Sequence, residues 1–473
     1  MENLTRMDLG IVALYLVFML VIGVLSVRKI KNAEDYFVAG RSLGLFTMIA
    51  TVCATIIGGG ALIGRGGVVY DRGVMAVWLA IPYFIGMVAF SFIAKRINRL
   101  GKSHGVSSIP DLMEKRYGKS VKLIFSLLIA YTMMATVGSQ ISATATIIKI
   151  VGVKWNISYE IGALIATAIF IIYTSASGLF GVVYTDVAQC LILIVSVYVI
   201  VPIVAVSKVG SLAGLFSQIP GEMLEVLPDA SFAGYIFTNL LFSFAGAEMW
   251  QRAFASKDGS VAKKGIFFGT MAYGVTILIT LVLGLCAYVL LPDLLAVYGT
   301  TDAAVPALIL ACLPIGLRGL AIAGLLGVMM SSSDSYLLVS TQTIIGDIVK
   351  SWKPQISQET ELKLSRLITP LLGFGALIIA LYIKRVYEAL MFAWTFYAAS
   401  VGLPAFAALY WKRATKAGVV SAVLAGFGSS CLWHALGSPR GLADSLVGGV
   451  VCLIALVCVS LCTYQPGRYP RLE

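Results

Sequence analysis

Long apolar stretches recur along the chain between Ile11 and Cys462, and short polar stretches separate them. A helix needs roughly 20 consecutive apolar residues to span a bilayer, and about thirteen stretches meet this requirement. Their approximate extents are 8–27, 45–69, 74–97, 120–150, 157–175, 182–207, 231–252, 265–291, 318–348, 363–383, 386–411, 415–437 and 442–463. The pattern predicts an all-α membrane protein of about thirteen transmembrane helices.

The composition supports this prediction. Hydrophobic residues make up 59% of the 473 residues and charged residues only 12%, whereas soluble domains carry about 25% charged residues. Such a chain cannot cover its surface with polar groups in water, so membrane lipid is its expected surrounding. We therefore expect a multi-pass protein of the plasma (inner) membrane.

The charged and reactive residues exclude several other classes. The net charge of +12 comes from basic residues in short loops, so we expect no nucleic-acid partner. The eight cysteines lie in apolar stretches without a CxxC pair, as small buried residues do. We find neither a nucleophile–base motif nor a phosphate-binding GxxxxGK[ST] loop. The chain is therefore expected to be neither an enzyme nor an ATP-driven pump.

The distribution of basic residues predicts the orientation. An odd number of spans places the termini on opposite sides of the membrane. With the N-terminus outside, 25 of the 35 lysines and arginines, Arg252 among them, fall in cytoplasmic segments and only nine in external ones. Cytoplasmic loops carry the excess of basic residues, which favours an external N-terminus and a cytoplasmic C-terminus. Arg65 alone is expected inside a span.

The second span contains three consecutive glycines, Gly58, Gly59 and Gly60. Each glycine costs a helix about 1 kcal/mol relative to alanine, so the helix is expected to unwind there and release backbone carbonyls. Free carbonyls at membrane depth are tolerated only where protein, water or an ion satisfies them. The segment therefore predicts an ion and solute site, although close packing between helices explains it equally well. Gly246 in the seventh span marks a second possible break, five spans later.

The ninth span contains four serines and a carboxylate in consecutive positions, as SSSDS at 331–335. Ser331, Asp334 and Ser335 share one helix face, and hard cations prefer oxygen ligands. A charged residue inside a membrane span is a candidate for function. The alternative is that the serines bond their own helix and Asp334 lies near a membrane edge.

Two further carboxylates lie in predicted spans. Asp186 in the sixth span is either a cation ligand or a helix cap near the inner interface. Glu248 either contacts a cationic part of the solute or pairs with Arg65 or Arg252. Arg65 either steadies an anionic group or anchors a helix end.

Several motifs together resemble the solute:sodium symporter family. They are DYFVAGRSL at 35–43, the glycine-broken segment ending in Gly64, SGLFGVVYTDVAQ at 177–189 and MSSSDS at 330–335. Their order and spacing match over roughly residues 8–420. The resemblance implies a single transporter domain with a core of two inverted five-helix repeats at about 45–411 and a broken first core helix. One extra helix at about 8–27 precedes the core, and two at about 415–437 and 442–463 follow it.

The resemblance also implies where ions bind. The main sodium site carries over to the carbonyls of Ala54, Ile57 and Val328 and to the hydroxyls of Ser331 and Ser332. A second sodium site, present in some members, carries over to Asp186, Ser331, Asp334 and Ser335. Asp334 stands where several members have serine, so binding of a second sodium stays open.

The solute is expected beside the broken helix. The expected contacts are Gly58, Gly59, Gly60, Ser139, Gln140, Ser243 and Glu248. The motifs are most similar to those of choline transporters, but Ile56, Met133 and Gly246 stand where their caging tryptophans are expected, which argues against choline. The prediction is a sodium-coupled symporter that imports a small polar organic solute (an amino acid, sugar, organic cation or carboxylate) by alternating access. A proton-coupled porter that uses Asp186 and Asp334 and a transporter-like membrane sensor are the alternatives.

Overall fold

A computed structural model describes residues 4–27, 30 and 32–467 of the chain, and this part contains helices and no β-strand. Among the described residues, eleven helices are long and apolar enough to cross a membrane. Shorter apolar helices at Leu45–Ile56 and Tyr159–Ile172 complete the thirteen predicted spans. In chain order the spans are α1 (Arg6–Val27), α3 (Leu45–Ile56) with α4 (Arg65–Arg72), α5 (Ile81–His104), α7 (Lys119–Val151), the first half of α8 (Tyr159–Leu193), its second half with α9 (Val201–Val209), α11 (Ala233–Ala245) with α12 (Ala247–Ala255), α13 (Gly259–Leu290), α16 (Leu317–Gln342), α18 (Gln358–Tyr382), α19 (Val386–Tyr410), α20 (Lys416–Ala435) and α21 (Asp444–Thr463).

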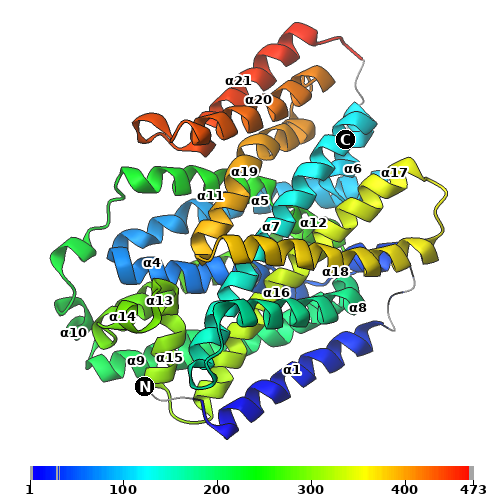
Figure 1. Ribbon diagram of the computed structural model, residues 1–473. Helices are drawn as coiled ribbons and strands as arrows, with labels where there is room; N and C mark the ends of the chain where they lie inside the picture. The colour runs from blue at the N-terminus through cyan, green and yellow to red at the C-terminus, as the bar shows by residue number, and fades with distance from the viewer. Residues whose placement is uncertain (1–3, 28–29, 31, 468–473) are drawn as a thin grey trace.

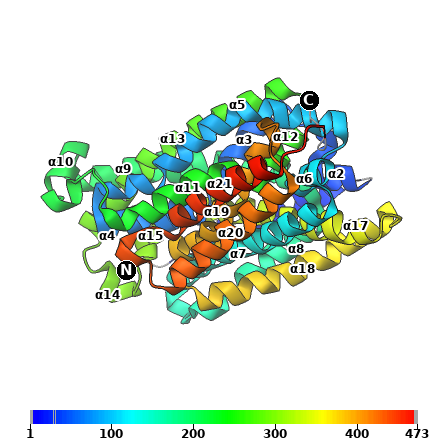
Figure 2. The ribbon, with the colours of Figure 1, turned by 90° about the horizontal axis from the view of Figure 1, so that it is seen from above.

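Short helices gather at the two ends of the bundle. Figures 1 and 2 show α10 (Leu212–Ser217), α14 (Leu294–Tyr298) and α15 (Ala304–Cys312) at one end, and α2 (Ala33–Val38), α6 (Ile109–Tyr117) and α17 (Lys350–Trp352) at the other. This separation agrees with the predicted alternation of loops between the two sides of a membrane. The remaining turns are π-helical at η2 (Gly60–Gly64), η5 (Ile194–Ile200) and η9 (Thr343–Val349), and 3-10 helical at η1 (Ala39–Arg41), η3 (Gly73–Leu79), η4 (Val153–Trp155), η6 (Gly221–Leu224), η7 (Ala230–Phe232), η8 (Thr301–Ala303) and η10 (Pro439–Gly441).

The central element of the bundle is α16. It packs against α1, α3, α7, α8 and α18, and every residue from Ala321 to Gln342 is buried. A buried hydroxyl needs a hydrogen-bond partner, which either its own helix or a neighbouring element provides. The serine-rich segment of α16 therefore depends on what α3 presents to it.

Two spans are interrupted, five spans apart, as the glycines predict. Helix α3 ends at Ile56, and Ile57 has a non-helical backbone with φ −83° and ψ 81°. Helix α11 ends at Ala245, where Gly246 takes φ −56° and ψ 102° before α12 begins. Both interruptions lie inside the bundle and leave backbone polar groups available at membrane depth.

A sharp turn divides α8 at Gly178, which has φ 51° and ψ −170°. This left-handed φ favours glycine. Space requires glycine as well, because a Cβ at this position would lie 2.7 Å from Cδ2 of the Tyr36 ring and 3.1 Å from the Tyr36 carbonyl oxygen. The short helix α2 is thus seated directly in the turn of α8.

The segment 208–230 packs against η3 at one end of the bundle. The indole of Trp78 donates a hydrogen bond to the Val226 carbonyl at 2.8 Å. Gly73, with φ 67°, lies so close to Met223 that a Cβ would meet its backbone. This segment is therefore held over one end of the bundle by specific contacts.

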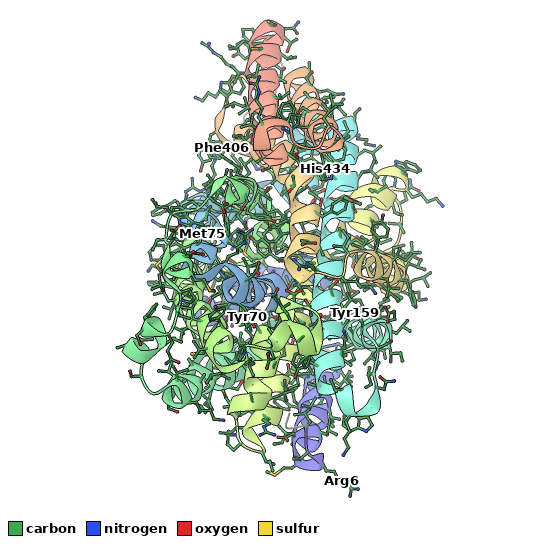
Figure 3. The ribbon with its side chains drawn as sticks, turned by 60° about the vertical axis from the view of Figure 1, so that its left-hand side comes forward. Arg6, Tyr70, Met75, Tyr159, Phe406 and His434 are labelled. Atoms are coloured by element: carbon green, nitrogen blue, oxygen red, sulfur yellow. The ribbon has the colours of Figure 1, made fainter. Side chains whose placement is uncertain are left out.

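The first and the last two spans lie at the periphery. Helix α1 packs on α8 and α16, and α20 and α21 pack on each other and on α19. Figure 3 shows Arg6, at the start of α1, at the opposite side of the molecule from Phe406 and His434. Large apolar side chains such as Leu14, Leu424 and Leu453 are exposed on these outer helices, as expected for positions that face lipid.

Candidate functional site

The break after α3 redirects the hydrogen bonds of its backbone. The Gly58 amide bonds the Ile56 carbonyl at 3.0 Å, and the Ala61 amide bonds the Gly58 carbonyl at 3.0 Å. The Gly59 amide donates to Oε1 of Gln140 on α7 at 2.7 Å. In an uninterrupted helix these three amides would bond the carbonyls of Ala54, Ile57 and Thr55. The break thus releases three carbonyls of α3 from the helix.

Serine hydroxyls of α16 meet two of these carbonyls. The Ser331 hydroxyl lies 3.1 Å from the Ala54 carbonyl oxygen and 2.9 Å from the Val328 carbonyl oxygen of its own helix. The Ser332 hydroxyl lies 3.2 Å from the Thr55 carbonyl oxygen. Both serines are fully buried. The structure thus brings oxygens of α3 and α16 together.

The three glycines also permit close packing. A Cβ on Gly58 would lie 2.9 Å from the Ser332 hydroxyl, and one on Gly59 would lie 2.6 Å from Cβ of Ala143. A Cβ on Gly60 would overlap Leu390 on α19. The two explanations of the glycine run are therefore compatible, because the break and the packing use the same three positions.

A fully buried arginine lies next to this junction. Arg252 on α12 donates hydrogen bonds to Ser335 at 2.7 Å, Thr51 at 3.1 Å and Asp186 at 3.4 Å. It also bonds the Thr55 hydroxyl. The assignment of Arg252 to a cytoplasmic segment is therefore wrong: the break before α12 turns this residue into the bundle.

The two aspartates of the predicted second ion site are fully buried. Asp186 accepts a 2.5 Å hydrogen bond from Thr51, so it does not cap a helix at the interface. Asp334 accepts a hydrogen bond from Thr174. One oxygen of each, Oδ1 of Asp186 and Oδ2 of Asp334, has no hydrogen-bond partner within the described part of the chain.

Glu248 stands in the first turn of α12 and is fully buried. Neither of its carboxylate oxygens has a hydrogen-bond partner among the residues described. The expected pairing with Arg65 or Arg252 does not form there: Arg65 bonds the Ala61 carbonyl and the Tyr273 hydroxyl, and Arg252 bonds only the backbone oxygen of Glu248. The carboxylate is therefore available for a ligand.

A small cavity of about 30 Å³ lies beside the break. It is lined by Ile56, Gly58, Gly60, Ala61, Arg65, Leu79, Tyr83, Gln140, Asn239, Tyr273, Tyr336, Tyr387, Leu390 and Trp394. Of the predicted solute contacts, Gly58, Gly60 and Gln140 line this cavity. The lining combines an apolar floor with convergent polar groups, as small-molecule sites usually do.

The other predicted solute contacts point elsewhere. The Ser139 hydroxyl bonds the Thr136 carbonyl at 2.8 Å and the Ser243 hydroxyl bonds the Leu240 carbonyl at 2.6 Å. Ser243 also faces Gly86 of α5, whose missing side chain makes room for it. Sequence reasoning missed Asn239 and four cavity tyrosines, because they come from separate helices and form no local motif.

Comparisons with known proteins agree with this geometry. A sequence model described as "Sodium:solute symporter family" matches residues 36–426. The osmoregulated proline transporter OpuE of Bacillus subtilis is 25% identical, with 96% of this chain and 94% of the relative aligned. The high-affinity proline transporter PutP of the same organism is 26% identical, with 95% and 97% aligned.

The fold is also found among solved structures. The substrate-bound outward-open state of a Na⁺-coupled sialic acid symporter matches with a TM-score of 0.84 and 18% identity, over 99% of both chains. The nucleobase-cation-symport-1 family transporter Mhp1 in a closed conformation matches with a TM-score of 0.61 and 12% identity, over 92% of this chain and 97% of Mhp1. The fold likeness confirms the predicted five-plus-five core with its broken first helix.

Proposed function

The chain belongs to the sodium:solute symporter family, and from this premise we propose that it imports a small polar organic solute together with sodium. The relatives named above are transporters, and the chain is a multi-pass membrane protein. The observation that carries the proposal is the meeting of Ser331 with the Ala54 carbonyl across the break in α3.

In this proposal sodium binds between α3 and α16. Its ligands are the carbonyls of Ala54, Ile57 and Val328 and the hydroxyls of Ser331 and Ser332. Hard cations prefer oxygen ligands, and a hydroxyl can turn its proton away so that the oxygen faces the ion. The bound ion then joins the interrupted helix to the central helix and stabilises the conformation that accepts solute.

The solute binds in the cavity beside the break. Arg65 and Gln140 offer hydrogen-bond donors, and Trp394 and the tyrosines offer apolar and aromatic contacts. Arg65 is buried and pairs with no carboxylate in the described chain, which favours solutes with an anionic group. Four predicted contacts do not line the cavity in this conformation. They are Gly59, Ser139, Ser243 and Glu248.

Sodium entry supplies enough free energy for accumulation. A membrane potential contributes about 2.3 kcal/mol per charge per 100 mV, and a tenfold sodium gradient adds about 1.4 kcal/mol. One sodium per solute then sustains roughly a 500-fold solute gradient. Alternating access, in which the outer side closes before the inner side opens, would couple the two movements.

The proposed setting is the plasma (inner) membrane. The N-terminus is external and the C-terminus cytoplasmic, following the excess of basic residues on the cytoplasmic side. The core comprises the helices within about 45–411, and α1, α20 and α21 are the added helices. Lipid contacts the outer helices, and the chain acts as a transporter rather than an enzyme.

The test begins with a thermal-shift screen of the purified chain against amino acids, sugars, organic cations and carboxylates, with and without sodium. The expected result is a stabilising solute whose effect increases with sodium. Uptake of that solute into proteoliposomes is then measured under a sodium gradient and under a proton gradient. Uptake driven by protons alone would replace the proposal by a proton-coupled porter, and binding without uptake by a sensor.

A further inference from the structure

The oxygen atoms around Arg252 form the kind of cage that a small hard cation takes. The guanidinium donates hydrogen bonds to three hydroxyl oxygens and one carboxylate oxygen, which come from α3, α8 and α16. They belong to Thr51, Thr55, Ser335 and Asp186. Removing the arginine side chain would leave these four oxygens facing one buried space.

All four residues predicted to hold a second sodium already have an oxygen engaged in a hydrogen bond, Asp334 through Thr174. The Ser331 hydroxyl bonds the Ala54 and Val328 carbonyls. The Ser335 hydroxyl and Oδ2 of Asp186 accept hydrogen bonds from Arg252. Of these side chains' carboxylate oxygens, only Oδ1 of Asp186 and Oδ2 of Asp334 have no hydrogen-bond partner in the described chain. These two oxygens, one of them on the carboxylate that already pairs with Arg252, are a poor site for a sodium ion, because few ligands replace its water and the arginine repels it.

The charged groups around Arg252 also argue against a sodium ion beside Asp186. Arg252 is the cation that pairs with Asp186, and breaking such a buried pair by removing one partner is costly. The other buried carboxylates nearby are Glu248 on the same helix and Asp334 on α16, and neither lies within ion-pair distance of the guanidinium in the described chain. The arginine therefore pairs with one of the two carboxylates that the second sodium would need.

We propose that the guanidinium of Arg252 is a tethered cation that permanently takes the place of the second sodium. The chain then binds one sodium, at the α3–α16 junction, and moves one sodium with each solute. This inference rests on the proposed function and deepens it by assigning the stoichiometry. Arg252 acts as a specificity-determining residue: its side chain decides how many ions the oxygen-rich region accepts.

The test is equilibrium binding of ²²Na⁺ to the purified full chain in nanodiscs, without solute. The expected ratio is one sodium per chain, with an affinity that falls in Ser332→Ala. A ratio of two in the wild-type chain overturns the inference while leaving sodium coupling intact. No sodium binding at all overturns the proposed function and the inference together.

Substitutions of Arg252 test whether its charge limits the chain to one sodium ion. In Arg252→Gln the ratio is expected to rise from one towards two, because the oxygen cage loses its resident charge. In Arg252→Lys it stays at one, since the charge is kept. Arg116→Gln is the matched control: this buried arginine bonds only backbone carbonyls of the α19 end, and its loss leaves the ratio at one.

An Arg252→Gln chain that stays folded and still binds one sodium with unchanged affinity contradicts the proposal. If Arg252→Gln does not fold, the double variant Asp186→Asn/Arg252→Gln removes both charges of the pair together. The expected ratio for this variant is again one, with an affinity close to that of the wild type. A loss of sodium binding in the double variant would place the ion at Asp186 and overturn the inference.

Discussion

The hydroxyl of Ser331 on α16 lies 3.1 Å from the carbonyl oxygen of Ala54 on α3. This contact joins the central buried helix to a helix that has lost its regular hydrogen bonds. Both groups are already desolvated, so an ion that enters between them needs little further dehydration of the protein. The consequences can be tested at single side chains.

The first prediction concerns the serines of α16. Ser331→Ala or Ser332→Ala should raise the sodium concentration for half-maximal uptake about tenfold, the effect of losing about 1.4 kcal/mol from one oxygen ligand. Ser333→Ala is the control, because the Ser333 hydroxyl bonds the Met329 carbonyl of its own helix at 2.7 Å. Equal sodium dependence in all three variants would remove the ion from this junction.

The second prediction concerns the glycines of the break. Gly59→Ala should destabilise the chain by about 1–3 kcal/mol, as overpacking does, because its Cβ would lie 2.6 Å from Ala143 and 2.9 Å from the Met329 sulfur. Gly10→Ala on α1 meets nothing within 4 Å and should leave the melting temperature unchanged or slightly higher. The two melting temperatures, measured in detergent, make the comparison. An unchanged melting temperature in Gly59→Ala would contradict the prediction, because Ala143 and Met329 would then make room for the Cβ at little cost.

The third prediction concerns the buried carboxylate of Glu248. Glu248→Gln should raise the melting temperature of the solute-free chain, because a buried carboxylate without partners is costly and glutamine keeps its shape. If the carboxylate contacts a cationic group of the solute, the same change should weaken competition by solutes that carry an amine. A lower melting temperature together with an unchanged competition profile would assign Glu248 a purely structural role.

The fourth prediction concerns Asp302, in the loop between α13 and α16 outside the spans. Burial raises the pKa of its carboxyl to about 6, although the Val386 amide and Arg385 favour the charged form. Glu388 adds to the increase. The folded chain therefore binds this proton more tightly than the unfolded chain does. Stability should fall as the pH rises from about 4 to 6, by up to about 3 kcal/mol.

The measurement for Asp302 is the melting temperature against pH. Because other carboxyl groups titrate in the same range, the informative quantity is the difference between the wild type and Asp302→Asn. The variant should lose the decrease between about pH 4 and 6 that this single group causes. Parallel curves for the two proteins would show that Asp302 keeps an ordinary pKa.

The number of spans and the two broken helices follow from local patterns in the sequence, whereas the approach of α16 to α3 is implied by the family resemblance. Runs of apolar residues define the spans, and the glycines from Gly58 to Gly60 and Gly246 mark the breaks. Ser331 and Ser332 are singled out by the resemblance of the MSSSDS motif to the family, because the residues alone also allow these serines to bond their own helix.

The place of Arg252 could not be predicted in the same way. A basic residue at the apparent end of a span is usually a loop charge, and only the turn at Gly246 brings it inside. Its partners Thr51, Asp186 and Ser335 are distant in the chain, and none carries a local signal for arginine. The cavity tyrosines are equally scattered. Such contacts depend on how helices are stacked, which hydrophobic periodicity does not determine.

The turn of α8 at Gly178 has a mechanical consequence. The ring and backbone of Tyr36 fill the space that a side chain at Gly178 would occupy. The short helix α2 therefore packs tightly into the bend of α8. Any rocking of α8 must either carry Ala33–Val38 along as one rigid piece or pull the tyrosine out. The linker between the first two spans is therefore expected to move together with α8.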